Sequence, residues 1–314
     1  IRKENELENQ INTARREAKS AFGKDDVFFE KLIEKAFHVE VQIVGDTHGN
    51  IVHLFERDCS LQRRHQKVVE RAPAAYLSNK ERESICQAGV RIGKQVDYSC
   101  AGTVEFLMDA KSREFFFIEV NPRVQVEHTV TEEITGIDIV KAQFLLASGA
   151  KIGDGVCGVP EQQDIKMKGH AIQSRVTTED AANDFAPDYG KITVYRSASG
   201  HGIRLDAGTA ATGTVITPYY DSLLVKVSAK GQSPFEAKQR MDRALSEFRV
   251  RGVKTNIPFL LKLINHPGFN KFDYHTKFID SEKSLFEFSG RKDRASKTLN
   301  FLAEVIVNGN MEVA

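Results

Sequence analysis

The spacing of apolar residues changes several times along the chain and predicts both helices and strands. Apolar residues recur every three or four positions within residues 4–22, which predicts a polar helix with one apolar stripe. Residues 27–33 include an apolar run of strand length. Residues 38–44 alternate between polar and apolar, and residues 51–55 follow after turn-forming residues. This period of two predicts a β-hairpin.

Capping and turn residues predict the next elements. Ser78 and Glu81 have the spacing of a capping box, which opens a helix. Residues 102–108 and 115–120 are apolar-rich strand candidates on either side of a polar turn. Asp138 is placed to cap a further helix.

The pattern changes after a glycine-rich segment at residues 150–167, where we place a domain boundary. Helices are predicted to open at Ser233 and at Asn256. Before them, short strands are predicted at 170–177, 191–196, 203–206, 213–217 and 223–228. The sequence therefore predicts an α+β fold whose second half is mostly antiparallel β with flanking helices.

Composition and charge exclude several classes of protein. Among the 314 residues, 44 Lys and Arg balance 43 Asp and Glu, and the net charge of +1 argues against a protein that mainly coats nucleic acid or a membrane. No apolar run approaches the roughly 18 residues of a transmembrane helix. The 4 cysteines show no CxxC spacing, so we expect a reducing compartment. Because the chain begins with Ile, we expect it to be an internal piece of a longer protein.

The two strands around Ser112 carry the strongest chemical signal. In a hairpin centred on Ser112, Glu105 lies directly opposite Glu119, and like charges at such positions repel. Asn121 lies two residues beyond Glu119 and shares its face. Two carboxylates and an amide oxygen suit Mg²⁺, which would remove the repulsion. The alternative is a solvated hairpin whose glutamates point into water.

Polar residues continue at every odd position from 119 to 127. If this stretch is extended, Arg123, Gln125 and Glu127 lie in one row with the predicted metal site. An arginine and a glutamate beside a metal can hold a small anion and deprotonate it, whereas a surface ion pair is the alternative.

A basic segment at residues 62–67 could bind a phosphate or a carboxylate-like anion. Its alternatives are a solvated face and an RNA contact, and the absence of interleaved aromatic residues disfavours RNA. No GxxxxGK[ST] motif is present, so any ATP is not held by a P-loop.

These segments together resemble biotin carboxylases of the ATP-grasp superfamily. The resemblance covers nearly the whole chain and is carried by residues 30–31, 38–42, 56–70, 72–74, 102–106, 117–128, 169–175, 187–192, 219–221 and 251–256. Residues 175–180 and the segment from Arg291 to Gly309 resemble the pyruvate carboxylase branch of that family. The resemblance implies a ligase that uses ATP and bicarbonate to carboxylate biotin through carboxyphosphate, the first half-reaction in converting pyruvate to oxaloacetate.

The resemblance also implies roles for individual residues. The ligands of Mg²⁺ or Mn²⁺ would be Glu105, Glu119 and Asn121. ATP would contact Glu30, Lys31, Ile33, His38, Gln62 and His65. Bicarbonate would be bound by Lys67, Arg123, Gln125 and Val126. Glu127 would be the general base that deprotonates bicarbonate, and Arg175 would stabilise the biotin enolate.

The domain organisation implied by the resemblance has four parts. Residues 1–33 would be a remnant of the ATP-grasp lid, and residues 34–167 the ATP-grasp core with the metal and bicarbonate sites. Residues 168–280 would be the C-terminal subdomain, and residues 281–314 a linker into the next domain. The family's N-terminal subdomain and glycine-rich lid loop have no counterpart in these residues, so we expect this piece alone to be inactive.

The implied partners lie mostly on the same longer chain. They are a carrier domain that bears biotin and a carboxyltransferase domain, within a homo-oligomer such as a tetramer. An acetyl-CoA effector could bind near Arg294, and neither nucleic acid nor a membrane is expected as a partner. The location would be cytoplasmic in a bacterium and the mitochondrial matrix in a eukaryote.

Three alternatives stay open. The chain could be the biotin carboxylase part of an acyl-CoA carboxylase, or another ATP-grasp ligase such as a carbamoyl phosphate synthetase. The third alternative is a catalytically inert regulatory or assembly fragment, because part of the ATP site would be absent.

Overall fold

A computed structural model describes residues 3–208, 210–288 and 294–309, which fall into two units, residues 1–34 and residues 35–314. In the first unit, η1 (Glu4–Glu6) leads into α1 (Leu7–Phe22), as the helical spacing predicts. Gly23 ends α1 in the left-handed conformation that glycine adopts without strain. The strand predicted at residues 27–33 is wrong, because residues 24–33 form neither helix nor strand and no partner strand pairs with them.

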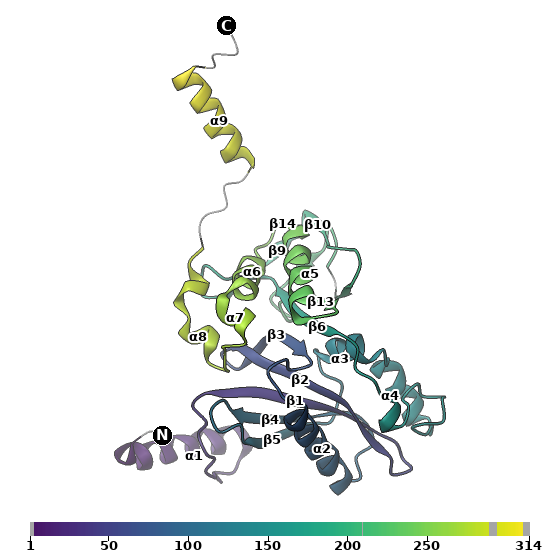
Figure 1. The fold of residues 1–314 in the computed structure, drawn as a ribbon. Coiled ribbons are helices and arrows are strands. Elements are labelled where there is room, and N and C mark those ends of the chain that lie inside the picture. The colour runs from purple at the N-terminus through teal and green to yellow at the C-terminus, as the bar shows by residue number, and fades with distance from the viewer. Residues whose placement is uncertain (1–2, 209, 289–293, 310–314) are drawn as a thin grey trace. The chain divides into compact units, whose positions relative to one another are not determined.

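The second unit is built on an eight-stranded sheet in which all neighbouring strands are antiparallel (Figure 1). Its order is β11-β13-β6-β3-β2-β1-β4-β5. In chain order the strands are β1 (Ala36–Gly45), β2 (Ile51–Arg63), β3 (Gln66–Ala72), β4 (Cys100–Asp109), β5 (Phe115–Asn121), β6 (His170–Thr177), β11 (Ile203–Ala207) and β13 (Leu223–Gly231). The predicted α+β class is confirmed.

Three pairs of short strands form separate two-stranded sheets. They are β7 (Glu179–Asp180) with β8 (Ala186–Pro187), β9 (Gly190–Lys191) with β12 (Val215–Ile216), and β10 (Val194–Arg196) with β14 (Arg249–Arg251). The helices of the unit are α2 (Asn79–Gln95), α3 (His128–Thr135), α4 (Ile139–Ala147), η2 (Gln162–Asp164), α5 (Pro234–Glu247), α6 (Ile257–Asn265), α7 (Pro267–Lys271), α8 (Phe278–Ser281), η3 (Lys283–Phe286) and α9 (Arg294–Asn308).

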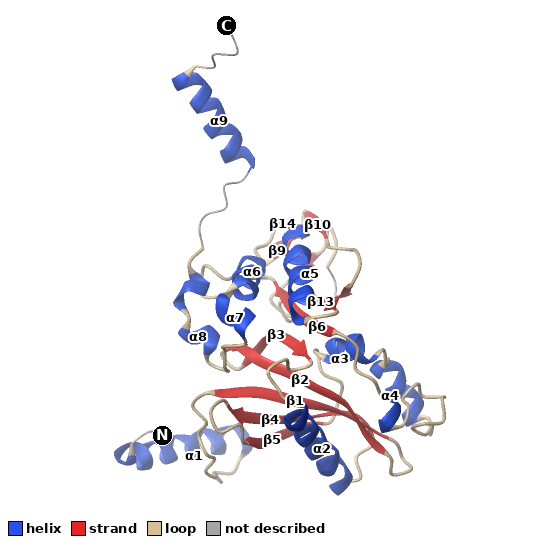
Figure 2. Cartoon of the chain, viewed as in Figure 1, coloured by secondary structure: helices blue, strands red, loops and turns tan. Residues whose placement is uncertain are grey.

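The sheet continues across the boundary predicted near residue 167, because β6 pairs with β3 through four residues (Figure 2). The residues on the two sides of this boundary therefore share one sheet, and the four predicted domain ranges stay predictions. An effector was expected near Arg294, whose side chain lies outside the described residues, as do the neighbouring Arg291 and Lys292. Within the described residues, no helix combines the length and apolar content that a membrane crossing requires.

Helix α2 covers one face of β1 and β4, and this face is apolar. Val39, Val41 and Ile43 pack there with Ile85 and other side chains of α2. Gly89 allows the close approach, because a Cβ at that position would lie 2.9 Å from Cγ1 of Val41. The opposite face of β1 carries the polar residues of the period-two pattern. The sequence pattern therefore places the core on one side of β1 and charged side chains on the other.

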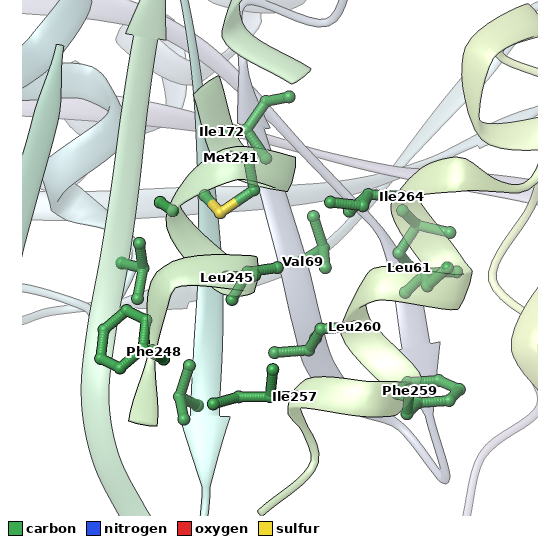
Figure 3. Close-up of a cluster of buried hydrophobic side chains, with 14 of the residues drawn as sticks. Leu61, Val69, Ile172, Met241, Leu245, Phe248, Ile257, Phe259, Leu260 and Ile264 are labelled. Carbon is green, nitrogen blue, oxygen red and sulfur yellow. The ribbon is translucent and has the colours of Figure 1, made fainter. Parts of the chain in front are cut away.

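A second core lies under α5 and α6 (Figure 3). Met241 and Leu245 of α5 and Leu260 of α6 pack onto Val69 of β3 and Ile172 of β6. This core joins α5 and α6 to strands from both sides of the predicted boundary. It thereby fixes the position of β6 beside β3. Lys67 and Glu70 of β3 belong to the candidate site described below.

The capping box of α2 predicts a measurable contribution to stability. The Ser78 hydroxyl accepts the backbone N–H of Glu81, and the Glu81 carboxylate accepts the N–H of Ser78 at 2.8 Å. We expect Ser78→Ala to lower the free energy of unfolding by about 1 kcal/mol, because the hydroxyl satisfies a free donor at the helix start. Urea unfolding at pH 7 measures this loss, and Lys80→Ala, at an exposed position of the same helix, should change stability far less.

The Glu81 carboxylate also predicts a pH dependence. A hydrogen bond from Arg113 lowers the pKa of Glu81 to about 2, against a smaller opposing effect of burial. A carboxylate with a lowered pKa stabilises the fold fully above its unfolded pKa, near 4.5, and loses this contribution as the pH falls towards 2. We therefore expect Glu81→Gln to destabilise the protein at pH 7 and to matter less at pH 3. A stability difference that does not change between these pH values would contradict the assignment.

Candidate active site

A single row of directly opposed residues crosses four strands of the sheet. Arg57 of β2 pairs with Glu40 of β1, Glu40 pairs with Glu105 of β4, and Glu105 pairs with Glu119 of β5. Three adjacent carboxylates in such a row repel one another. The row is therefore stable only if cations lie beside it, and the structure shows which ones do.

Arg57 neutralises one end of the row and is fully buried. Its Nε donates to Glu40 Oε1 at 2.5 Å. Its remaining N–H groups donate to side-chain oxygens, at 2.6 Å for Gln42 and at 3.1 Å for Thr103, Gln125 and Thr131. A guanidinium has five N–H donors, and these five contacts match that number. Arg57 therefore fixes both Glu40 and the predicted bicarbonate residue Gln125.

Lys67 lies over the middle of the row and contacts three carboxylates. Its Nζ lies 2.5 Å from Glu40 Oε2, 2.8 Å from Glu105 Oε1 and 2.7 Å from Glu127 Oε1. Burial alone would lower the pKa of Lys67, but the surrounding carboxylates, Glu40 first, raise it above the ordinary value. The ammonium therefore stays charged and joins residues of β1, β3, β4 and the start of α3.

The carboxyl groups of Glu40 and Glu105 are held ionised. Burial would raise the pKa of Glu40, but Arg57 and Lys67 lower it to about 2. Burial also opposes ionisation of Glu105, whereas a 2.8 Å contact with His38 and the charge of Lys67 hold its pKa at about 2. Both side chains therefore carry negative charge at neutral pH.

Arg175 of β6 approaches the same group of side chains from the C-terminal half of the chain. Its Nε donates to Glu70 Oε1 at 2.6 Å, and its Nη2 donates to Glu127 Oε2 at 3.1 Å. Nearby carboxylates raise its pKa further although burial opposes this. The two oxygens of Glu127 are thus bound by Lys67 on one side and by Arg175 on the other.

The register predicted for the acidic hairpin is confirmed, because Glu105 pairs with Glu119. The ladder is not uniform: Phe106 pairs with Phe117, so the strand bulges at Ile118. Nδ2 of Asn121 donates to Glu105 Oε1 and to Glu119 Oε1, both at 3.0 Å. One amide therefore bridges the two carboxylates.

These three side chains fit a divalent cation. Within the described residues, no Lys, Arg or His forms an ion pair with Glu119, so the repulsion between Glu119 and Glu105 lacks a cation of its own. Turning the amide of Asn121 about its terminal bond would replace its nitrogen by an oxygen and give three oxygen ligands. Lys67, the lysine that contacts Glu105, is already shared with Glu40 and Glu127.

The other predicted residues lie in several environments. Gln62 is buried, and its amide nitrogen contacts His38 Nδ1 at 3.0 Å. His65 is exposed in the turn between β2 and β3. Arg123 is exposed and donates to the Val124 carbonyl at 3.2 Å. The carbonyl of Val126 accepts from Lys226 Nζ at 3.2 Å. Glu30, Lys31 and Ile33 belong to the unit of residues 1–34, and their roles stay predictions.

Sequence reasoning did not assign Glu40, Arg57 or Glu70 to the site, although all three are fully buried in it. A signal for Glu40 was present, because the alternation in residues 38–44 places it on the same face as His38 and Gln42. Glu70 of β3 carries no comparable signal. Its contact with Arg175 depends on the pairing of β3 with β6, which no local pattern indicates.

Comparison with known proteins gives matches over nearly the whole chain. Residues 1–154 match the family "Carbamoyl-phosphate synthase L chain, ATP binding domain", and residues 173–281 match "Biotin carboxylase C-terminal domain". Pyruvate carboxylase from Bacillus subtilis is 55% identical over 309 residues, which are 98% of this chain and 27% of that protein. The chain therefore spans about a quarter of the length of this curated relative.

Two solved structures are similar in fold. Rhizobium etli pyruvate carboxylase with the allosteric activator acetyl coenzyme-A gives a TM-score of 0.87 and 60% identity, over 96% of this chain and 27% of that one. The biotin carboxylase domain dimer of Hydrogenobacter thermophilus 2-oxoglutarate carboxylase, in complex with MgADP and bicarbonate, gives 0.85 and 40%, over 92% of this chain and 62% of that one. With the shared sheet and the charged cluster, these matches show that the chain belongs to the biotin carboxylase family, and that it matches the biotin carboxylase region of pyruvate carboxylases.

Proposed function

We propose that this chain forms most of the biotin carboxylase part of a pyruvate carboxylase. Within the complete enzyme it acts as a ligase that carboxylates biotin with ATP and bicarbonate, the first half-reaction on the way from pyruvate to oxaloacetate. The observation that carries this proposal is the position of Glu127, whose buried carboxylate is held between the cations Lys67 and Arg175. Such a carboxylate can accept a proton from a small acid bound beside the cations.

The first step needs bicarbonate to become a nucleophile. Glu127 accepts the bicarbonate proton, while Lys67 and Arg123 hold the anion and Gln125 orients it. Gln125 is suited to this role because Arg57 fixes its carbonyl oxygen and its Nε2 donates to Glu105 Oε1 at 2.7 Å. The deprotonated oxygen then attacks the terminal phosphate of ATP, forming carboxyphosphate and releasing ADP. Transfer of a phosphoryl group depends mainly on such positioning and on cationic stabilisation of charge.

The remaining residues bind the nucleotide and biotin. Glu105, Glu119 and Asn121 would hold Mg²⁺ or Mn²⁺, which neutralises charge on the ATP phosphates. His38, Gln62 and His65, with Glu30, Lys31 and Ile33 of the lid remnant, would contact ATP. Arg175 stabilises the negative charge that develops on biotin when it becomes the acceptor, by the same electrostatic principle.

We propose that biotin is delivered by a carrier domain of the same longer chain, which also carries the carboxyltransferase domain. A Rhizobium etli structure described as a complete multifunctional pyruvate carboxylase supports this organisation. An oligomer is supported by the domain dimer of the Hydrogenobacter thermophilus enzyme, and an acetyl-CoA effector by the Rhizobium etli complex. We propose a location in the cytoplasm of a bacterium or in the mitochondrial matrix of a eukaryote, which is supported by relatives that include bacterial enzymes and one named mitochondrial.

The metal assignment predicts how the enzyme responds to Mg²⁺. In the complete carboxylase, we expect Glu119→Gln to raise the Mg²⁺ concentration for half-maximal ADP release by about tenfold, because a neutral amide replaces one anionic ligand. A titration of ADP release with Mg²⁺ at saturating ATP measures this shift. Glu114→Gln, at the exposed turn of the same hairpin, serves as the matched control. An unchanged Mg²⁺ requirement in Glu119→Gln would remove Glu119 from the ligand set.

A further inference from the structure

Five side chains from three elements form a connected ring between Glu127 and Arg175. Arg175 Nη2 contacts Glu127 Oε2 at 3.1 Å, and Arg175 Nε contacts Glu70 Oε1 at 2.6 Å. Gln173 Nε2 then donates to Glu70 Oε2 at 2.9 Å, and the Thr129 hydroxyl donates to Gln173 Oε1. The backbone from Thr129 back to Glu127 closes the ring.

The secondary structure sets the spacing of this ring. Gln173 and Arg175 are two residues apart on β6 and therefore share one face. Glu70 of β3 pairs directly with Gln173, so its carboxylate lies between the two β6 side chains. Thr129 lies in the first turn of α3, two residues after Glu127, and α3 contacts both β3 and β6. The ring therefore joins the start of α3 to two paired strands.

The chemistry of the groups allows one consistent direction of hydrogen bonding. The Glu70 carboxylate only accepts, so the Gln173 amide must present its nitrogen to Glu70 and its oxygen to Thr129. Glu70, Gln173 and Thr129 are all fully buried, so water does not compete for these contacts. The Thr129 oxygen also lies 3.0 Å from the Ser228 hydroxyl of β13, which anchors the far side of the ring. The guanidinium of Arg175 is thereby held in one orientation relative to Glu127.

We propose that Glu70, Gln173 and Thr129 are positioning residues for the transfer of the carboxyl group to biotin. This inference rests on the proposed function, in which Arg175 stabilises biotin. The three residues act through Arg175, which they hold at a fixed angle. Glu127 has a separate contact with Lys67, so it stays placed for the bicarbonate step when the ring is opened. Opening the ring therefore separates ATP cleavage from biotin carboxylation.

The experiment measures this separation in the complete, biotin-bearing carboxylase. The readout is the number of ADP molecules released per oxaloacetate formed, at saturating ATP, bicarbonate and pyruvate. We expect Gln173→Met to raise this ratio by about tenfold, since small displacements of a reacting group cost rates of this order or more. Thr129→Val removes the hydrogen bond between Thr129 and Gln173 by changing its donor instead of its acceptor. The effects of the two substitutions should not add in the double variant, because both remove the hydrogen bond between Thr129 and Gln173.

Ser174→Ala provides the matched control. Ser174 is the buried residue between the two ring members of β6, on the other face of the strand, and its hydroxyl has no hydrogen-bond partner among the described residues. It should keep the ratio of the unmodified enzyme. A purely structural role for the ring would lower ADP release and product formation together and leave the ratio unchanged.

The outcomes separate this inference from the proposed function. If folded Gln173→Met and Thr129→Val keep the ratio of the unmodified enzyme, the positioning role is overturned while the proposed function stands. If Gln173→Met fails to fold, Thr129→Val, which replaces a hydroxyl by a methyl group of similar size, decides the question by the same ratio. If the unmodified enzyme releases ADP without any need for bicarbonate, the proposed function is overturned, and the positioning role that rests on it is overturned as well.

Discussion

Arg57→Met lowers the free energy of unfolding by about 3–5 kcal/mol, the largest change in stability expected for a substitution in this cluster. Arg57 is fully buried and pairs with the equally buried Glu40 at 2.5 Å. Methionine fills a similar volume but carries no charge, so Glu40 keeps Lys67 as its remaining close cation. Gln42 and Gln125 lose the N–H groups that Arg57 donates to them. An unpaired charge and unsatisfied amides in a buried site cause the loss.

Urea unfolding of the 314-residue chain and its variants measures this effect. Arg57→Lys retains the charge but not the five donors, so we expect it to recover only part of the stability. Arg243→Met removes an exposed ion pair with Glu247 and should cost at most about 1 kcal/mol. If Arg57→Met is no more destabilising than Arg243→Met, the row of charges is not held together by Arg57.

Lys67→Gln is expected to have the largest effect on activity after loss of the base itself. In the complete carboxylase we expect bicarbonate-dependent ADP release to fall on the order of 100- to 1,000-fold, as found when one preorganised stabilising group is removed from a catalytic site. Lys67 neutralises Glu40, Glu105 and Glu127 together. Without it, three carboxylates repel bicarbonate and the ATP phosphates from the same place.

Steady-state ADP release at saturating ATP and bicarbonate measures this loss. Lys254→Gln is the control, because Lys254 is an exposed lysine whose ion pair with Asp180 lies outside the cluster. If Lys67 only supported the fold, its replacement would lower the melting temperature of the protein without a specific loss of kcat. Retention of more than a tenth of the activity by a folded Lys67→Gln would contradict the role assigned to this lysine.

The acidic hairpin could be predicted because its evidence is local. Residue spacing alone placed Glu105 opposite Glu119, and the structure confirms the pair. A turn centred on Ser112 does not by itself explain how all residues of the hairpin pair. The ladder near the turn is offset by one residue, and the bulge at Ile118 restores the pairing of the glutamates. Periodicity gives the face of each side chain, whereas a bulge depends on contacts that periodicity does not contain.

The rest of the cluster could not be predicted because it depends on strand order. Glu40 becomes the centre of the site only when β1 lies between β2 and β4. The sequence alone did not assign Arg57 or Glu70 to the site, because their roles follow from pairings with β1 and β6. The apolar run at residues 27–33 shows the converse error, because strand-like composition does not supply a partner strand.

The central claim is that Glu127 is the base in an ATP- and bicarbonate-dependent carboxylation of biotin. The most direct measurement is ADP release by the complete carboxylase, with and without bicarbonate, beside its Glu127→Gln variant, which keeps the size of the side chain but cannot accept the proton. We expect release that requires bicarbonate and falls on the order of 100-fold or more in the variant. Release that is indifferent to bicarbonate, or equal in a folded Glu127→Gln, would contradict the account.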